Sequence, residues 1–200
     1  MPPKGQATAE RIEQAALKLF AARGYAAVSM RDIADGVGIR QGGLYNHFPT
    51  KQSILFGLLA GHMERLITAW GENAAGGSAA ERLTAFARFH IRFHFARPDE
   101  VFIAYMELRS LEAENFTAIE RLRDRYEAGL RDILDELGQA EPAVAARALI
   151  AMLTGVTTWY RPGGRLSIGA VEALYVDMAR GAVGLSPLSQ EMELACSTAA

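Results

Sequence analysis

An all-α fold is predicted by three features of this 200-residue chain. Every long segment repeats apolar residues at the helical period, and no segment alternates apolar and polar residues as a half-buried strand does. Capping and breaking residues divide the chain into about nine helices. Because half of the residues are hydrophobic, the chain can bury one large helical core, or a small domain joined to a larger one.

Capping signals delimit these helices in order. The first covers residues 9–23, with Gly24 as its C-cap. Thr50 can cap a long helix over 51–73, and a capping box of Ser78 with Glu81 opens a helix over 79–96. Four later helices cover 99–110, 115–137, 142–160 and 168–184. Asp99 opens the first, Gly138 ends the second, Pro142 lies in the first turn of the third and Ser167 caps the fourth.

Residues 29–51, SMRDIADGVGIRQGGLYNHFPTK, are the most informative segment. They predict two short helices joined by a glycine turn and then the start of a third. Ser29 suits an N-cap with Asp32 three residues on, and Gly38 can take the left-handed conformation of a tight turn. Leu44 and Phe48 form a buried stripe, which leaves five polar or aromatic side chains outward: Arg40, Gln41, Tyr45, Asn46 and His47. Such a helix can read DNA in the major groove.

Side-chain chemistry suggests a role for each outward residue. Gln41 can pair with adenine, Arg40 with guanine or phosphate, Tyr45 with the groove edge and His47 with a phosphate. Lys51 suits a phosphate contact, and Ser29 and Arg31 can hold the other side of the backbone. Packing of Tyr45 and His47 inside the head is the alternative.

Gly42 and Gly43 lie inside the second short helix, where each costs about 1 kcal/mol relative to alanine. Their missing side chains can let the backbone approach DNA closely. The alternative is a loosely ordered helix that tightens on binding.

Three stretches, TAERIEQAALKLFAARGYAAVSM, IADGVG and GGLYNHFPTKQSIL, resemble the DNA-binding half of the tetracycline-repressor (TetR) family over residues 8–55. The resemblance implies a helix-turn-helix DNA-binding domain of residues 1–52 and a ligand-binding and dimerisation domain of residues 53–186. Residues 187–200 are expected to be a disordered tail. In this family Arg40 stands where a serine or threonine cap is usual, and Gly43 where a small hydroxyl or alanine is usual.

The resemblance also implies partners. They are a double-stranded, palindromic operator, a second copy of the chain and a small-molecule effector that releases a repressor from DNA. The homodimer would form through helices 142–160 and 168–184, which are rich in small and apolar residues. The alternative is that these two helices complete the core of a monomer.

Charge and composition agree with a cytoplasmic regulator. Residues 1–51 carry seven Lys or Arg and four acidic residues, whereas the whole chain has a net charge of −2. A positive head on a negative body fits a head that faces DNA. The single cysteine, Cys196, makes no intrachain disulfide, and the chain begins without a signal-peptide pattern. The apolar stretch over 148–160 is too short to span a membrane, so no membrane contact is expected.

An aromatic and histidine stripe, FARFHIRFHF, covers residues 86–95. By the family resemblance the stripe can line an effector pocket, whose residues would be Phe86, Phe89, His90, Phe93, Tyr105, Arg109, Tyr126, Met152 and Trp159. Plain core packing is an equal alternative. His90 and His94 have the i, i+4 spacing of metal ligands, but no HExxH pattern is present, and no metal site or cofactor is expected.

Residues 157–167, TTWYRPGGRLS, place Arg161 and Arg165 on either side of a Pro-Gly-Gly breaker. The segment is similar to one in TetR-type regulators that respond to coenzyme A thioesters, and guanidinium groups match phosphate geometry. The alternative is an ordinary loop between helices.

The sequence contains no catalytic constellation and no phosphate-loop or dinucleotide fingerprint, so an enzyme is not expected. The prediction is therefore a ligand-responsive DNA-binding repressor with a hydrophobic or acyl-coenzyme-A effector. Two other readings stay open. One is a helical metal-binding protein or enzyme that uses His90 and His94, and the other is a DNA-binding protein without an effector.

Overall fold

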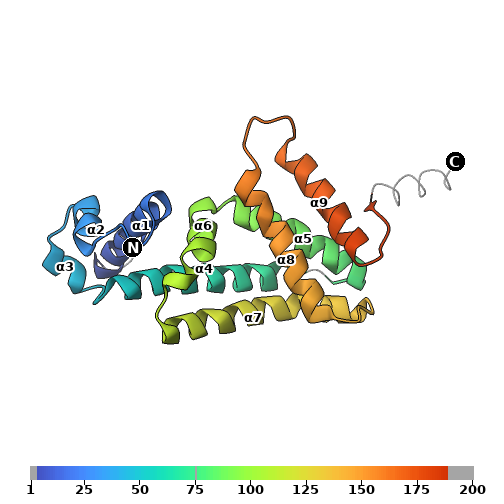
Figure 1. Cartoon of the computed structure of the whole chain (residues 1–200), viewed down its shortest axis with the longest axis horizontal. Helices are drawn as coiled ribbons and strands as arrows, with labels where there is room; N and C mark the ends of the chain where they lie inside the picture. The colour runs from blue at the N-terminus through green and yellow to red at the C-terminus, as the bar shows by residue number, and fades with distance from the viewer. Residues whose placement is uncertain (1–3, 75, 189–200) are drawn as a thin grey trace. The chain divides into compact units, whose positions relative to one another are not determined.

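The computed structural model describes residues 4–74 and 76–188, and this part of the chain is helical without a strand (Figure 1). The all-α fold with about nine helices is confirmed for the described residues. The elements in chain order are α1 (Lys4–Arg23), α2 (Met30–Val37), α3 (Gln41–Tyr45), α4 (Lys51–Asn73), α5 (Ala79–Phe95), α6 (Pro98–Met106), the 3-10 turn η1 (Leu108–Ser110), α7 (Ala113–Glu136), α8 (Pro142–Trp159) and α9 (Ile168–Ala182).

The predicted caps form as expected. The Ser78 side chain accepts from the backbone of Glu81 while the Glu81 carboxylate accepts from Ser78, and the Thr50 hydroxyl accepts from the backbone of Ser53. Gly24 ends α1 with a φ of 79°. Two boundaries differ by more than two residues. Helix α1 begins at Lys4, before the predicted start at residue 9, and the helix predicted over 99–110 ends at Met106 and is followed by the separate turn η1.

By packing, the chain divides into two compact units. Unit 1 holds residues 1–65 and 97–123, and unit 2 holds residues 66–96 and 124–200. Helix α4 therefore contributes to both, and α6, η1 and the start of α7 pack with the N-terminal helices. This division describes packing, and a functional boundary near residue 52 stays a prediction.

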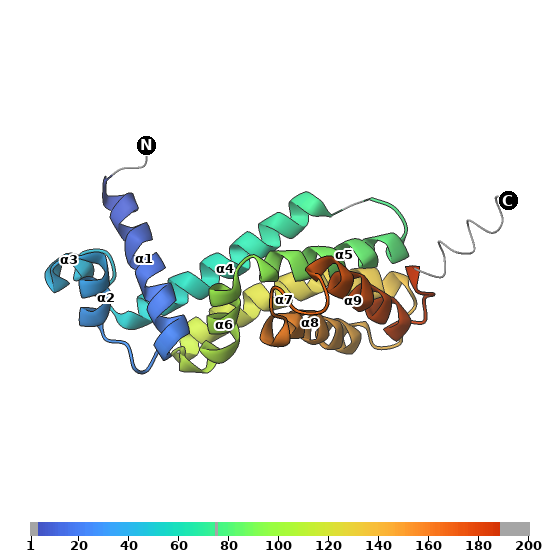
Figure 2. The ribbon, with the colours of Figure 1, turned by 90° about the horizontal axis from the view of Figure 1, so that it is seen from above.

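The core of unit 1 is apolar and joins α1 to α4 and α6. Ile12 and Phe20 of α1, Leu44 of α3 and Ile54 of α4 are fully buried, and Ile103 of α6 belongs to the same cluster. At roughly 25 cal/mol per Å² of buried apolar area, such side chains supply most of the stability of the unit. They fix α2 against α1 and α3 against α2 (Figure 2).

A hydrogen-bond network ties the turn after α1 to the end of α6. The Glu107 carboxylate accepts from the backbone N–H of Tyr25 at 3.0 Å and from the hydroxyl of Ser110 at 2.7 Å. The Gln52 amide donates to the Tyr25 hydroxyl and to the Ser110 carbonyl, and its oxygen accepts from the backbone of Glu112. The segment around η1 is thus hydrogen-bonded to the α1–α2 turn and the start of α4.

In unit 2, α5 packs against α8 and α9. The Arg92 guanidinium donates two hydrogen bonds to Glu172, at 2.6 and 2.8 Å, and joins α5 to α9. Bidentate arginine–carboxylate pairs of this kind are among the stronger polar contacts in proteins. Leu188, in the predicted tail, donates from its backbone to Asp177 on α9, and residues 189–200 lie outside the described part of the chain.

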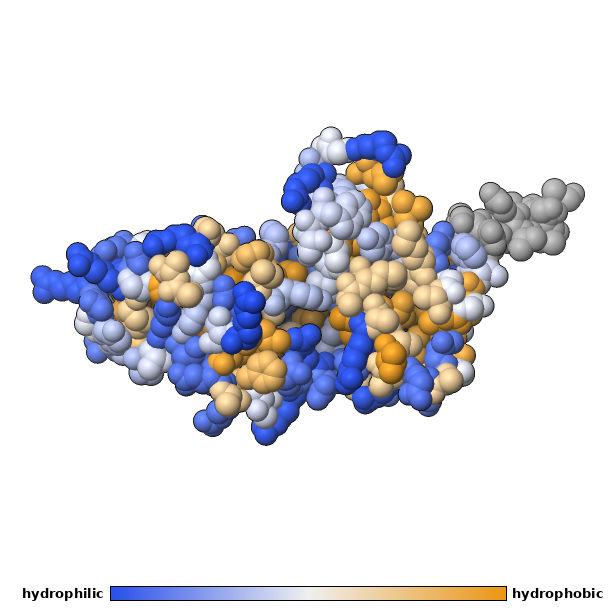
Figure 3. Space-filling view, in the orientation of Figure 1, coloured by the Kyte–Doolittle hydropathy of each residue, from blue (hydrophilic) through white to orange (hydrophobic). Residues whose placement is uncertain are grey.

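Helix α8 has a more apolar composition than its burial requires. It is 18 residues long with a mean hydropathy of 1.2, and 28% of it is buried within the chain. It begins at Pro142, earlier than the apolar stretch over 148–160, and by length and composition alone it is long enough to cross a membrane. Core helices of soluble proteins can have the same length and composition, but they are mostly buried. Figure 3 shows apolar surface over this helix.

Candidate functional site

The α2–α3 segment is built from local signals around Ser29 and Gly38. The Ser29 hydroxyl accepts from the backbone of Asp32, and the Asp32 carboxylate accepts from the Ser29 backbone at 2.8 Å, which completes a capping box. Hydrogen bonds from Ser29 lower the pKa of Asp32 to about 2. Gly38 ends α2 with a φ of 74°, in the left-handed region that favours glycine.

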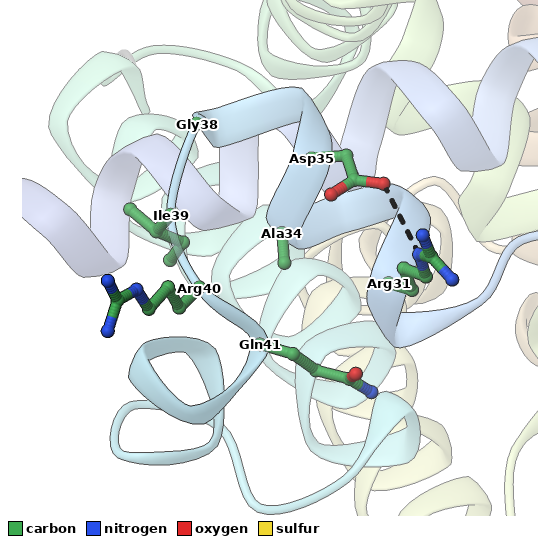
Figure 4. A pocket seen from close by; sticks show the side chains of 7 residues that line it. All are labelled: Arg31, Ala34, Asp35, Gly38, Ile39, Arg40 and Gln41. Atoms are coloured by element: carbon green, nitrogen blue, oxygen red, sulfur yellow. Dashed lines mark ion pairs between the residues drawn. The ribbon is translucent and has the colours of Figure 1, made fainter.

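Beside this turn lies an open hollow of about 540 Å³. Figure 4 shows its lining residues: Arg31, Ala34, Asp35, Gly38, Ile39, Arg40 and Gln41. The Arg40 and Gln41 side chains extend in different directions from the segment that joins α2 to α3. Arg31 lies 3.8 Å from Asp35 in an exposed ion pair, which water screens and which a phosphate can replace at little cost.

Helix α3 presents polar groups on an apolar anchor. Leu44 is fully buried, whereas Tyr45 is 46% exposed and Gln41 and Asn46 are also exposed. His47 is half-buried, so packing remains part of its role. Arg40 occupies the N-cap position without a side-chain capping bond, which leaves its guanidinium available to a ligand.

Gly42 and Gly43 have open space around them. A Cβ added at either position meets no heavy atom within 4 Å, and neither residue has a positive φ. Packing and backbone geometry of the described chain therefore do not require glycine at these two positions. Their absent side chains leave the α3 backbone accessible.

The structure gives Lys51 a structural role that the sequence did not predict. Its ammonium donates to the carbonyl oxygens of Tyr25 and Val28, at 2.8 and 2.7 Å, and lies 4.2 Å from the centroid of the Tyr25 ring. Burial lowers the pKa of Lys51. The predicted contact between the Lys51 side chain and a phosphate would have to compete with these two carbonyls.

The predicted effector residues are divided between the two units. Tyr105 and Arg109 lie in unit 1, whereas Phe86, Phe89, His90, Phe93, Tyr126, Met152, Trp159, Arg161 and Arg165 lie in unit 2. In unit 2 the first part of the stripe is closely packed: Trp70 contacts Phe86 and Phe89 with ring centroids 5.0 and 5.4 Å apart. Arg161 and Arg165 are exposed between α8 and α9.

A buried polar triad lies within this aromatic packing. His90 Nδ1 is 2.9 Å from the Tyr126 hydroxyl, and His90 Nε2 is 2.8 Å from the Thr154 hydroxyl. Because Thr154 donates its own proton to the Ile150 carbonyl, it accepts from His90 Nε2–H, and Tyr126 then donates to Nδ1. Burial raises the pKa of Tyr126 well above its usual value, so this hydroxyl stays protonated.

These hydrogen bonds argue against the alternative in which His90 and His94 bind a metal ion. His94 Nδ1 donates to the His90 carbonyl at 2.8 Å, and the two rings stack at 4.0 Å. A metal on His90 would displace Tyr126 or Thr154 from its ring. Within residues 4–74 and 76–188, no group of three or more His, Cys, Asp or Glu is placed to hold a metal ion. The arrangement favours a structural role for both histidines.

Two family models match the chain. Residues 12–58 match the model described as bacterial regulatory proteins of the tetR family. Residues 76–183 match the model described as the tetracyclin repressor-like C-terminal domain. The first match contains α2 and α3, and the second contains the aromatic stripe and the segment around Arg161.

Similar proteins include regulators with known structures. The chain is 31% identical over 193 residues to the HTH-type transcriptional repressor KstR2 of Mycobacterium tuberculosis, a match that covers 90% of this chain and 95% of that protein. The crystal structure of a tetR-family regulatory protein from Rhodococcus RHA1 has a TM-score of 0.85 and 25% identity, and covers 92% and 100% of the two chains. AibR in complex with isovaleryl coenzyme A and operator DNA shares the fold, with a TM-score of 0.76 and 24% identity over 86% and 97%.

Proposed function

Because the chain belongs to the TetR family of bacterial regulatory proteins, we propose that it is a repressor that binds a palindromic operator as a homodimer and is released by a small effector. The observation that carries the DNA-binding role is the exposed face of α3 on its buried anchor Leu44. The polar side chains and the half-exposed ring of Tyr45 on this face can reach a DNA duplex while unit 1 stays folded.

In this proposal some residues of the DNA-binding head contact bases and others contact phosphates. Gln41, Tyr45 and Asn46 face base edges, and the bare backbone at Gly43 permits a close approach. Arg31, Arg40 and His47 bind phosphates, which set the position on the duplex. Ser29 acts through its cap on α2, and Lys51 acts mainly by holding the α1–α2 turn.

Exposed apolar residues on α8 and α9 support a homodimer. Val144 is 63% exposed, Leu174 48% and Met178 53%, although helices of this composition are normally covered. A second copy of the same surface would cover them in a two-fold interface. Two heads would then meet half-sites about 34–36 Å apart, or a multiple of that spacing.

For the effector we propose an acyl coenzyme A thioester. AibR, which shares the fold, was crystallised with isovaleryl coenzyme A. In this chain Arg161 and Arg165 are exposed beside Trp159, where guanidinium groups can bind the phosphates of the coenzyme. The acyl part would enter among Phe86, His90 and their neighbours, a packed region that must rearrange to admit it. Such coupling is typically worth about 1–3 kcal/mol.

Operator binding tests the central proposal. DNA that binds the wild-type protein is selected from a random duplex library, and affinities are then measured at fixed salt. Arg40→Ala and Tyr45→Ala should each weaken binding about tenfold, the loss of roughly one good contact. Arg121→Ala, which removes an exposed arginine on α7, is the control and should bind like the wild type. If Arg40→Ala and Tyr45→Ala both retain full affinity, α3 is not the reading element.

The effector proposal has its own test. Isovaleryl coenzyme A and longer acyl thioesters are added to the protein–operator complex, with coenzyme A alone as the control. We expect release by at least one thioester, and a blunted response in the double variant Arg161→Ala, Arg165→Ala. An unchanged response would remove both arginines from the effector site.

A further inference from the structure

A second hollow lies where α6 leads through η1 into α7. It has a volume of about 240 Å³ and is lined by Tyr105, Met106, Leu108, Arg109 and Phe116, all within unit 1. Three lining side chains are large and well exposed: Tyr105 is 54% exposed, Met106 47% and Phe116 39%. Figure 3 shows apolar surface near the end of α6. Large apolar side chains gathered around one hollow are typical of a binding surface.

The charged group in this lining is the Arg109 guanidinium. Arg109 is exposed, and among the residues that the structure describes it forms no ion pair. Glu107 is the nearest carboxylate to Arg109 along the chain. It accepts hydrogen bonds from the Tyr25 backbone and from the Ser110 hydroxyl and forms no ion pair with Arg109. An anion in the hollow would therefore meet an arginine with its donors available.

We propose that this hollow binds a small amphipathic anion, with an apolar body against Tyr105, Met106 and Phe116 and a carboxylate on Arg109. Guanidinium binds carboxylate through two parallel hydrogen bonds, which selects a planar anion over a neutral or cationic group. The volume lies below the roughly 300–1,000 Å³ of drug-sized ligand pockets, so one aromatic ring or a short acyl chain fits. Its lining residues belong to unit 1, whereas most of the residues assigned to the acyl coenzyme A belong to unit 2.

The same connection carries the contacts to the DNA-binding head. Leu108 lines the hollow and also packs against the head core cluster around Phe20 and Leu44. Two residues beside Leu108 and Arg109 also contact the head. Glu107 accepts from the Tyr25 backbone and the Ser110 hydroxyl, and the Ser110 carbonyl accepts from Gln52. A ligand that shifts η1 must therefore disturb the support of α2 and α4. This coupling rests on the proposed operator binding, whereas occupancy of the hollow does not.

Binding is tested without DNA, on the full chain, with 4-phenylbutyrate and its neutral amide as probes. Backbone amide NMR shifts of residues 105–116 are followed during each titration. We expect saturable shifts, with the carboxylate binding at least fivefold more tightly than the amide. Arg109→Gln should abolish this preference, whereas Arg121→Gln, the matched control on α7, should retain it.

A second variant separates the apolar contact from the charge. Phe116→Ser should weaken both probes by a similar factor, and unchanged shifts elsewhere would show that the variant is folded. The proposal is overturned if 4-phenylbutyrate causes no saturable shift in these residues, or if Arg109→Gln binds it as tightly as the wild type. Neither result bears on the operator test, because Arg40 and Tyr45 are not involved.

Discussion

Glu100 on α6 binds His62 on α4, with its carboxylate oxygen 2.9 Å from Nδ1 of the imidazole, and Arg65 donates to the same oxygen at 2.9 Å. His62 is 2% exposed, so the pair lies at the packed junction of the two helices. Burial by itself raises the pKa of Glu100, but the hydrogen bonds from His62 and Arg65 outweigh it and lower the pKa to about 2. The ionised carboxylate therefore links α6 to α4.

Glu100→Gln should lower stability in a pH-dependent way. The pKa of about 2 in the folded chain is below the unfolded value of about 4.3, so the ionised group stabilises the fold above that value. This contribution is lost as the pH falls toward 2. We expect the free energy of unfolding in urea to fall by about 1–2 kcal/mol at pH 7, and the deficit to shrink at pH 3. A deficit equal at both pH values would contradict the role of ionisation, and Glu114→Gln on α7 is the exposed control.

Lys51→Met should destabilise unit 1. The methionine retains much of the apolar stem but leaves the carbonyls of Tyr25 and Val28 without their donor. A loss of about 1–3 kcal/mol is expected from urea unfolding, with operator affinity reduced because the α1–α2 turn is no longer held. Lys18→Met, at an exposed position of α1, should change neither quantity. Unchanged stability would mean that Lys51 acts through DNA alone.

Gly43→Ala and Gly38→Ala should change stability in opposite directions. Alanine at position 43 meets open space and favours the helix, so the free protein should gain up to about 1 kcal/mol. Alanine at position 38 would be forced into a φ of 74° and should cost about 1 kcal/mol. Thermal unfolding checks both signs. If the proposed close approach of α3 is correct, Gly43→Ala also weakens operator binding despite its greater stability.

Leu174→Asp should separate the proposed dimer. A carboxylate on the exposed apolar surface of α9 would lose its water in a two-fold interface and would face its own copy across the axis. Sedimentation should show a shift toward the 21.7 kDa of a single chain. Thr117→Asp, on an exposed part of α7, is the control. A wild-type mass equal to one chain would reject the homodimer itself.

The head was largely predictable because its signals are local. The capping box at Ser29, the left-handed Gly38 and the anchor Leu44 are each set by residues within a few positions along the chain. The helix ends at Gly24 and Ser78 were predictable for the same reason. The exposure of Tyr45 follows from the position of Leu44 one residue earlier.

Contacts between distant residues were not predictable. Tyr25 and Glu107 are 82 positions apart, and no pattern in either segment indicates that they bond. The end of α6 at Met106 carries no proline or glycine, which explains why the predicted helix ran on to residue 110. Tyr105 and the stripe around His90 were assigned to one pocket by the family resemblance, whereas packing puts them in different units.

Both tryptophans, Trp70 and Trp159, belong to unit 2. Trp70 is partly buried and contacts the rings of Phe86 and Phe89, and Trp159 is 48% exposed next to Tyr175. Intrinsic indole emission therefore reports on unit 2, where we propose that the effector binds, because no tryptophan lies in the helices α1, α2 and α3. A fluorescence titration and a mobility-shift assay on the same sample would thus follow the two halves independently, without any added label.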